Sequence, residues 1–179
     1  LGDVYKRQLH IHFNEMETDN ILANIIVCQT VFRHTKVNKP RFSIFTPTYK
    51  TGERIKRTYQ GLVNQTFSNW EWIVVDDSTD DITWNILLEL KEKDYRVKPY
   101  RIFPLSGGNI GLAKNRAASL CDGDWLVELD HDDVLTKQCL EVSNDAILQY
   151  PDAGFLYSDV CEMFEDGGMK TYDHDFSGN

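Results

Sequence analysis

The sequence has no long apolar run, no closely spaced cysteine pair and no excess of basic residues, and each absence excludes a class of protein. The longest apolar runs, such as Trp72–Val75, are far shorter than the roughly 18 residues that a membrane span needs, so we expect no transmembrane segment. The four cysteines form no C-x-x-C pair, which argues against a zinc or redox motif. Twenty-eight acidic residues against 19 basic ones give a net charge of −9, so we expect no nucleic-acid partner.

The two ends of the chain are interpreted separately from its centre. Residues 1–8 lack an initiator Met and look like a translated adapter remnant, so we treat them as non-native. Residues 9–40 are predicted to form a helical extension, and residues 41–179 the main domain, incomplete at its C-terminal end. The chain has no signal pattern and we interpret its cysteines as reduced, which favours the cytoplasm, including the inner face of the membrane as a peripheral location.

From Arg41 onward, short β-rich runs alternate with segments of helical period, which predicts an α/β domain built from βαβ units. A hairpin is expected from Val160 onward, with its turn at Gly167 and Gly168. The predicted strands are 41–46, 70–75, 97–103, 125–129 and 153–157, and the predicted helices are 53–65, 82–93, 112–121 and 136–149.

The strongest chemical feature is Asp130-His131-Asp132-Asp133, directly after the predicted strand 125–129. Three carboxylates at one strand end repel one another unless a cation or a hydrogen-bonded ligand is present, and hard divalent ions prefer such oxygen ligands. The sequence therefore indicates a metal site. The alternative is an acidic loop that caps the next helix.

Three weaker features follow other predicted strands. Asp76 and Asp77 come after 70–75, and the carboxyl ends of parallel strands share one crevice where ligands bind. Pro47, Tyr49 and Lys50 follow the first strand and bring an aromatic ring and a cation to the same edge. The glycine-containing loop 107–111 is followed by Lys114, Asn115 and Arg116, whose cations suit a diphosphate.

In this order, the four features resemble glycosyltransferase family 2, over roughly Arg41 to Asp159. The resemblance implies the GT-A fold, a Rossmann-like three-layer α/β/α sandwich with a mainly parallel central sheet, here truncated at the C-terminus. It also implies a role for each residue. Pro47 and Tyr49 line the nucleobase pocket, and Asp77 or Asp76 binds the base. Lys114 lies near the nucleotide, Asp130 contacts ribose, and Asp130 with Asp132 coordinates Mn²⁺ or Mg²⁺.

The family's reaction sets further expectations. A sugar passes from a nucleoside-diphosphate sugar, most commonly a UDP-sugar, to a hydroxyl of a glycan, lipid-linked or other acceptor, with inversion at the anomeric carbon. The loop 109–115 is about two residues shorter than the family's usual form, so either Lys114 or Arg116 fills the cationic position. The catalytic base is expected beyond Asn179.

Two other functions remain as alternatives. Asp130-His131-Asp132-Asp133-Val134 also fits the D-x-D-x-[TV] motif of haloacid dehalogenase-like phosphatases, with Asp130 as nucleophile and Asp132 as general acid. Those enzymes carry the motif on their first strand, which argues against this function. The second alternative is a non-catalytic nucleotide-sugar or glycan-binding module.

Overall fold

The computed structural model describes residues 39–158, 160–164 and 168–172. The chain separates after Lys39, and the fold below is that of the unit Pro40–Asn179. The adapter-like segment 1–8 and the helix predicted within 9–40 lie outside the described residues.

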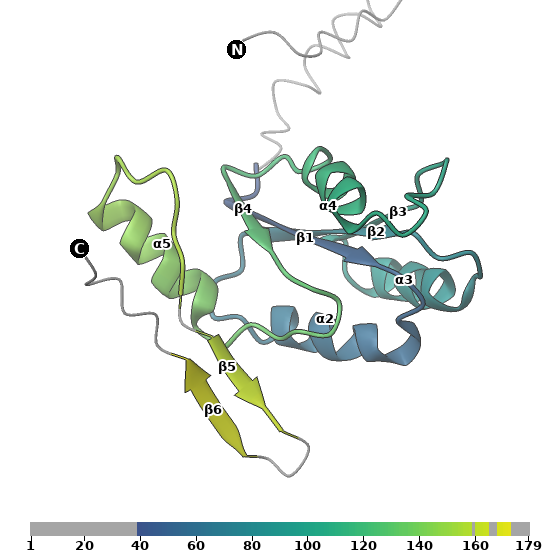
Figure 1. Cartoon of the computed structure of the whole chain (residues 1–179). Coiled ribbons are helices and arrows are strands. Elements are labelled where there is room, and N and C mark those ends of the chain that lie inside the picture. The colour runs from purple at the N-terminus through teal and green to yellow at the C-terminus, as the bar shows by residue number, and fades with distance from the viewer. Residues whose placement is uncertain (1–38, 159, 165–167, 173–179) are drawn as a thin grey trace, which may run out of the picture. The chain divides into compact units, whose positions relative to one another are not determined.

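Four parallel strands form the central sheet, in the order β3-β2-β1-β4 (Figure 1). The strands are β1 (Phe42–Thr48), β2 (Trp70–Asp76), β3 (Val97–Tyr100) and β4 (Trp125–Glu128). β1 pairs with β2 along its whole length, but with β4 only as far as the pair Phe45–Glu128. The last three residues of β1 therefore extend past the end of its pairing with β4.

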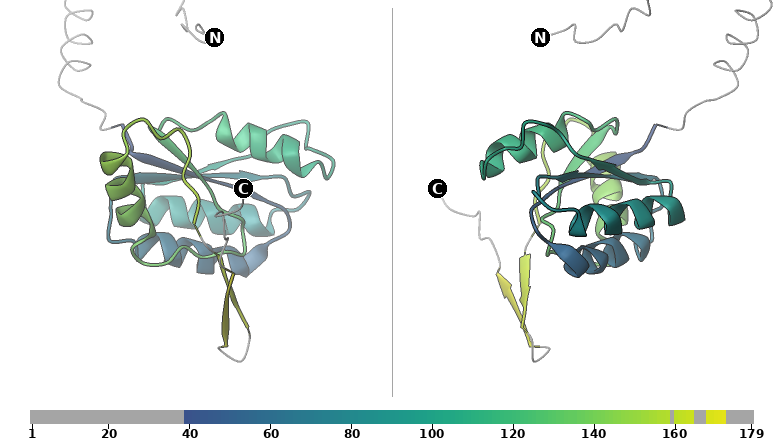
Figure 2. Two further views of the ribbon diagram at one scale, coloured as in Figure 1. Left: turned by 60° about the vertical axis from the view of Figure 1, so that its left-hand side comes forward. Right: turned by 90° about the vertical axis from the view of Figure 1, so that its right-hand side faces the viewer.

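Helices cover both faces of the sheet, which confirms the three-layer α/β/α sandwich (Figure 2). α2 and α3 lie on one face, and α4 lies on the other. The helical elements are η1 (Gly52–Arg54), α2 (Ile55–Val63), α3 (Ile82–Lys93), α4 (Ile110–Ala118) and α5 (Cys139–Gln149).

Alternating strand residues supply the two cores between these layers. Ile44, Trp72 and Val74 pack in the core that also holds residues of α2, α3 and α5, whereas Phe45 and Ile73 pack in the core beneath α4. A strand buried on both faces tends to be apolar, which fits the composition of β2, whereas the equally buried β1 carries three hydroxyl side chains, Ser43, Thr46 and Thr48.

The order of the strands creates a switch point between β1 and β4. The chain runs outward from β1 through β2 to β3, with α2 and α3 on one face, and returns across the other face through α4 to place β4 beside β1. In open α/β sheets, ligands bind beyond the carboxyl ends of the strands at such a reversal. The carboxyl ends of β1 and β4 are thus where the fold itself favours a ligand.

Two predictions of secondary structure are wrong. No strand forms at 153–157 within the described residues, and Phe155 and Tyr157 are exposed there. α5 begins at Cys139 instead of residue 136, because the Thr136 carbonyl accepts from Gln65 Nε2 at 2.8 Å and the Lys137 carbonyl accepts from the Thr66 N–H at 3.0 Å. These tertiary bonds hold the segment outside the helix.

Smaller differences concern the ends of elements and the hairpin. The third strand ends at Tyr100 and the helix after the glycine loop covers Ile110–Ala118, each shifted by a few residues from the prediction. The hairpin is present as the antiparallel pair β5 (Val160–Met163) and β6 (Met169–Tyr172), and residues 165–167 of its turn lie outside the described residues.

Candidate nucleotide and metal site

The acidic loop after β4 is fixed at both of its ends. The Leu129 N–H donates to the Phe45 carbonyl at 3.2 Å, and the Asp133 N–H closes a turn on the Asp130 carbonyl at 3.2 Å. α2 holds the loop from the side, since Thr58 Oγ1 donates to the His131 carbonyl at 2.9 Å. The side chains of Asp130 and Asp132 are about half exposed, so each remains partly accessible to a ligand.

α2 approaches the acidic loop closely at Gly61. A Cβ added there would lie 2.6 Å from Val134 Cγ1, too close for any real pair of carbons. The helix can therefore press against the loop only because residue 61 has no side chain.

Lys114 of α4 reaches one of these carboxylates, Asp130, from the other face of the sheet. Its Nζ lies 3.1 Å from Asp130 Oδ1 and also contacts Glu128 Oε1. The hydrogen bond to Glu128, followed by the one to Asp130, raises the pKa of Lys114 despite partial burial. Arg116 points elsewhere and donates to the Pro104 carbonyl at 2.6 Å. Of the two candidate cations, Lys114 is the one that lies beside the acids.

The acidic loop has the chemistry of a partial metal site. Burial, then the charges of Asp132 and Asp130, raise the pKa of Asp133, so negative charge is crowded there. Within the described residues, no three His, Cys, Asp or Glu side chains converge on one point as a complete ligand set. Mg²⁺ is commonly held by one or two carboxylates together with substrate phosphates, and Asp130 with Asp132 fits that kind of site.

The ends of β1 and β2 are joined next to this loop. Pro47 is buried, and Tyr49 is 53% exposed. Lys50 adopts φ 50°, and its N–H donates to Ser78 Oγ at 2.8 Å. This turn leaves the Tyr49 ring at the surface, with Lys50 Nζ 5.3 Å from the ring centroid.

Asp76 and Asp77 have different environments. Asp76 is fully buried, and its carboxylate accepts from Arg101 Nη2 at 2.8 Å and from the Ser78 N–H at 3.1 Å. Asp77 is 7% exposed, and its two oxygens accept from the N–H and the hydroxyl of Ser106, at 2.7 and 2.5 Å. Arg101 and Ser106 were missed from the sequence, in which Arg101 falls inside the predicted strand 97–103.

A second polar cluster, also missed from the sequence, lies toward the opposite edge of the sheet. Glu71, almost fully buried in β2, accepts from Ser43 Oγ, from Lys98 Nζ and from the Asp122 N–H. Burial opposes its ionisation, but the hydrogen bonds from Lys98 and Ser43 outweigh that effect and lower the pKa of Glu71. The cluster ties the start of β4 to β1, β2 and β3 and has no contact with the candidate site.

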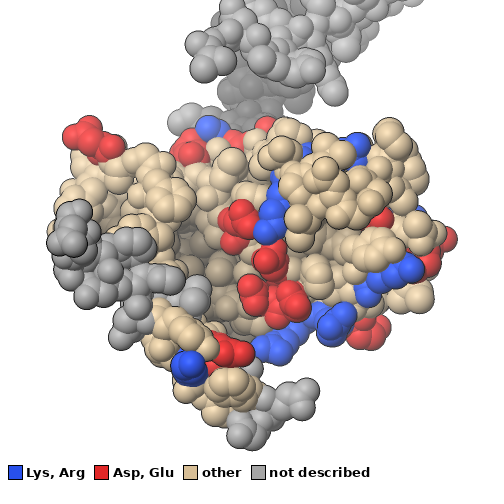
Figure 3. Space-filling view, in the orientation of Figure 1, with Lys and Arg blue, Asp and Glu red and all other residues tan. Residues whose placement is uncertain are grey.

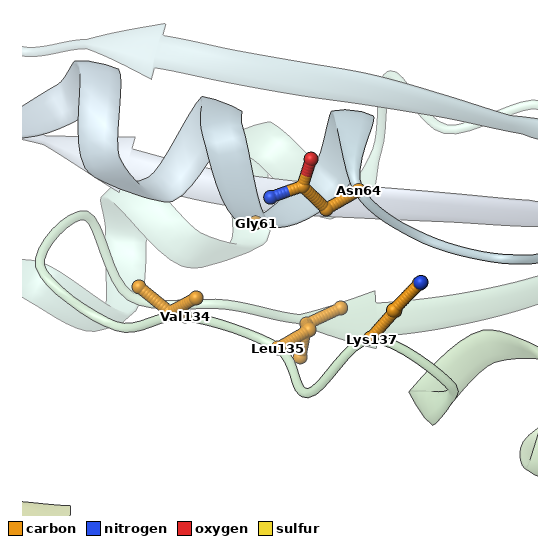
Figure 4. Close-up of a pocket in the computed structure, with 5 residues that line it drawn as sticks. All are labelled: Gly61, Asn64, Val134, Leu135 and Lys137. Carbon is orange, nitrogen blue, oxygen red and sulfur yellow. The ribbon is translucent and has the colours of Figure 1, made fainter.

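A shallow pocket of about 390 Å³ lies between α2 and the loop that follows β4 (Figure 4). Its lining consists of Gly61, Asn64, Val134, Leu135 and Lys137. None of the predicted site residues lines it. The acidic residues instead gather on the open surface, where they form a contiguous cluster next to basic side chains (Figure 3).

The sheet order and the polar strand ends define an open α/β domain of the kind that binds ligands beyond the carboxyl ends of its strands. The family model described as glycosyl transferase family 2 matches residues 43–170. The chain therefore belongs to glycosyl transferase family 2, as its motifs predict. This membership replaces the phosphatase alternative.

Several known proteins are similar to the chain. A putative teichuronic acid biosynthesis glycosyltransferase, TuaG of Bacillus subtilis, is 30% identical over 129 residues, which are 72% of this chain and 50% of TuaG. The chondroitin synthase of Escherichia coli is 34% identical over 106 residues, which are 59% of this chain and 15% of that enzyme. The chain thus spans half or less of the length of these relatives.

The fold has a counterpart in a crystal structure of S. aureus TarS, residues 1–349, in complex with UDP. The TM-score is 0.56 at 30% identity, covering 62% of this chain and 33% of that one. A complex of the same protein with UDP-GlcNAc gives the same TM-score and identity. Among the residues that the structure describes, no helix combines the length and apolar character of a membrane span.

Proposed function

We propose that this domain forms the donor site of an enzyme that transfers a sugar from a UDP-sugar to an acceptor hydroxyl. One observation carries the proposal: Tyr49 after β1, Lys114 on α4 and Asp130 after β4 come from three separate segments to the switch point of the sheet. A ring, a cation and carboxylates together match a base, a diphosphate and a metal–ribose contact.

The base and its pocket involve the ends of β1 and β2. The exposed ring of Tyr49 is free to stack on a nucleobase, with Pro47 as the floor of the pocket. We assign the base contact to Asp77, whose oxygens retain lone pairs beside those that accept from Ser106. Asp76, fully buried and paired with Arg101, positions that turn.

Asp130 and Asp132 would hold Mn²⁺ or Mg²⁺ together with oxygens of the donor diphosphate. When bound, such an ion acts as a Lewis acid that neutralises charge on the departing nucleoside diphosphate. Lys114 supplies a second positive charge at the same place, and its raised pKa keeps it protonated. The exposure of both aspartates supports entry of the ion together with the nucleotide.

Transfer itself is a single displacement at the anomeric carbon. The acceptor hydroxyl, on a glycan, lipid-linked or other acceptor, loses its proton to a general base and attacks from the side opposite the diphosphate, which inverts the configuration. We assign the base to none of the described residues. The names of TuaG and chondroitin synthase favour an acceptor that is a growing polysaccharide, and the free thiols of Cys121 and Cys139 favour the cytoplasm.

Thermal unfolding of this chain with UDP, GDP and CDP, each with Mn²⁺ or with chelator, tests the proposal. A nucleotide at one hundred times its Kd adds about 2.7 kcal/mol, a shift of roughly 5–11 °C at this size. We expect a metal-dependent shift for UDP that Asp132→Asn abolishes. Asp145→Asn, which removes an exposed carboxylate from α5, is the matched control and keeps the shift. A cooperative transition that no nucleotide moves contradicts the donor site.

A second measurement separates the transferase from a non-catalytic binding module. The protein is given UDP-sugars and oligosaccharide acceptors, and the product anomer is read by NMR. Inverted product supports the proposed reaction. Nucleotide binding without any transfer supports the binding module instead.

A further inference from the structure

We propose that Lys50, Arg54 and Arg57, here called the basic row, bind an anionic group of the acceptor, either a carboxylate or a phosphate. The inference rests on the proposed function and adds the chemical class of the acceptor. It depends on where the basic row lies, on its lack of ion-pair partners within the described residues and on the acidic charges near it.

The helical stripe that contains Arg54 and Arg57 faces the acidic loop. Positions 54, 57, 58 and 61 are spaced i, i+3, i+4 and i+7, so they share one side of η1 and α2. Thr58 donates to the His131 carbonyl, and Gly61 lies against Val134, which orients this side toward the loop 130–135. The positive charge of Arg57 reaches Asp133, where it lowers that residue's pKa against the larger raising effects.

The basic row is exposed and lacks ion-pair partners. Lys50, Arg54 and Arg57 are all exposed, and none has an ion pair within the part of the chain that the structure describes. The neighbouring Lys56 differs, because it pairs with Glu53 at 2.7 Å. A chain with net charge −9 thus presents unneutralised cations beside its acidic cluster, and Figure 3 shows basic side chains running along the α2 side of that cluster.

The two faces of the sheet bring separate cations to the neighbourhood of the acidic loop. Lys114 comes from α4 on one face, whereas Arg54 and Arg57 come from η1 and α2 on the other. Lys114 already contacts Asp130 and is assigned to the donor diphosphate. The basic row is therefore available for a second anion, and the second substrate of a transferase is the acceptor.

A narrow anionic chain fits this surface better than a flat anionic membrane. A bilayer that met the basic row would also meet the exposed carboxylates of Asp130 and Asp132 and the 74% exposed Glu53. Those charges repel an anionic surface within the Debye length of about 8–10 Å. A single polymer strand can contact the row and avoid them.

Binding of defined polymers to this chain tests the inference. The probes are fluorescent hyaluronan oligosaccharide for carboxylate, polyphosphate for phosphate and dextran as a neutral polymer, with phosphatidylglycerol vesicles as the membrane arm. We expect one or both anionic polymers to bind and dextran and vesicles not to bind. Arg54→Gln with Arg57→Gln should weaken the binding by about tenfold. Arg54→Lys with Arg57→Lys should retain most of it.

Lys91→Gln with Lys93→Gln is the matched control, because it removes the same two charges from exposed positions on α3. UDP binding is measured on every variant. Any of four results overturns the inference. Two concern the variants: an equal loss of polymer binding in the control, or loss of UDP binding in the Arg54 and Arg57 variant. The other two are vesicle binding through the basic row and no anion binding at all. Failure of wild type to bind UDP would overturn the proposed function instead. The polymer measurement is made without UDP, so the two failures can be distinguished.

Discussion

Lys114 Nζ lies 3.1 Å from Asp130 Oδ1, and the same ammonium group contacts Glu128. A protein cation thus contacts one oxygen of the carboxylate pair assigned to the metal. A divalent ion alone has to compete with this ammonium, whereas an ion arriving with a diphosphate gives Lys114 a new anionic partner. Metal and nucleotide binding should therefore be mutually dependent.

Lys114→Met tests this relationship with effects of opposite sign. Loss of the ammonium frees Asp130 and Glu128, so Mn²⁺ should bind the nucleotide-free variant more tightly than wild type. UDP in the presence of Mn²⁺ should bind about tenfold more weakly, because one charge-assisted contact to the diphosphate is lost. Titration calorimetry measures both affinities. Lys114→Arg should stay near wild type, and an unchanged UDP affinity in Lys114→Met would show that Lys114 does not contact the donor.

Arg101→Met should destabilise the domain, because it leaves the fully buried carboxylate of Asp76 without its counterion. Breaking one side of a buried ion pair costs about 3–5 kcal/mol. Urea unfolding of the single variant should show that loss. Adding Asp76→Asn should recover part of it, since an amide tolerates burial better than a carboxylate. A double variant no more stable than the single one would contradict this account.

Glu71 should make stability depend on pH on the acid side. Its pKa is lower in the folded state than the usual 4.5, so its contribution is present above the unfolded-state pKa and is lost as the pH falls through the folded-state value. Wild type should lose stability below about pH 4.5. Glu71→Gln should be less stable at pH 7 and show a shallower acid decline in urea unfolding at successive pH values. Parallel curves for the two proteins would exclude Glu71 as a source of that decline.

Gly123→Ala should destabilise by about 2–4 kcal/mol, because backbone atoms have to move. The added Cβ would lie 2.6 Å from both the N and the Oγ of Ser43. Gly154→Ala is the matched control, since no atom lies within 4 Å of its added Cβ, and it should change stability by less than about 0.5 kcal/mol. Similar unfolding midpoints for the two variants would refute the close approach of residue 123 to β1.

Local patterns predicted most of the fold. The helix Ile82–Lys93 matches its prediction at both ends, and β1, β2 and β4 match to within two residues, because hydrophobic period and buried apolar runs act over short distances. The prediction of a strand at 153–157 is wrong, because the apolar residues of this segment have no partner strand among the described residues. The late start of α5 depends on Gln65, far away in the sequence.

The candidate site was only partly predictable for the same reason. The strand-end acids and Lys114 follow local motifs, and the sheet order brings them to one edge. Arg101 and Ser106, which hold Asp76 and Asp77, belong to a loop without a motif. A hydrogen bond between residues that meet only after folding leaves no periodic signal in a single sequence.

The thin core beneath α4 has a consequence for how the donor site can adjust. α4 packs on the sheet through the small side chains Ala113 and Ala117, whereas α2 and α3 bury Leu62, Leu87 and Leu90. Separating α4 from the sheet exposes less apolar area than separating α2 or α3 does. The free energy of local opening should therefore be lower for α4. Amide hydrogens of α4 should exchange with deuterium before those of α3. Lys114 therefore belongs to the helix that opens most readily. The acids that it contacts, Glu128 and Asp130, lie at the end of a strand of the sheet, which remains closed.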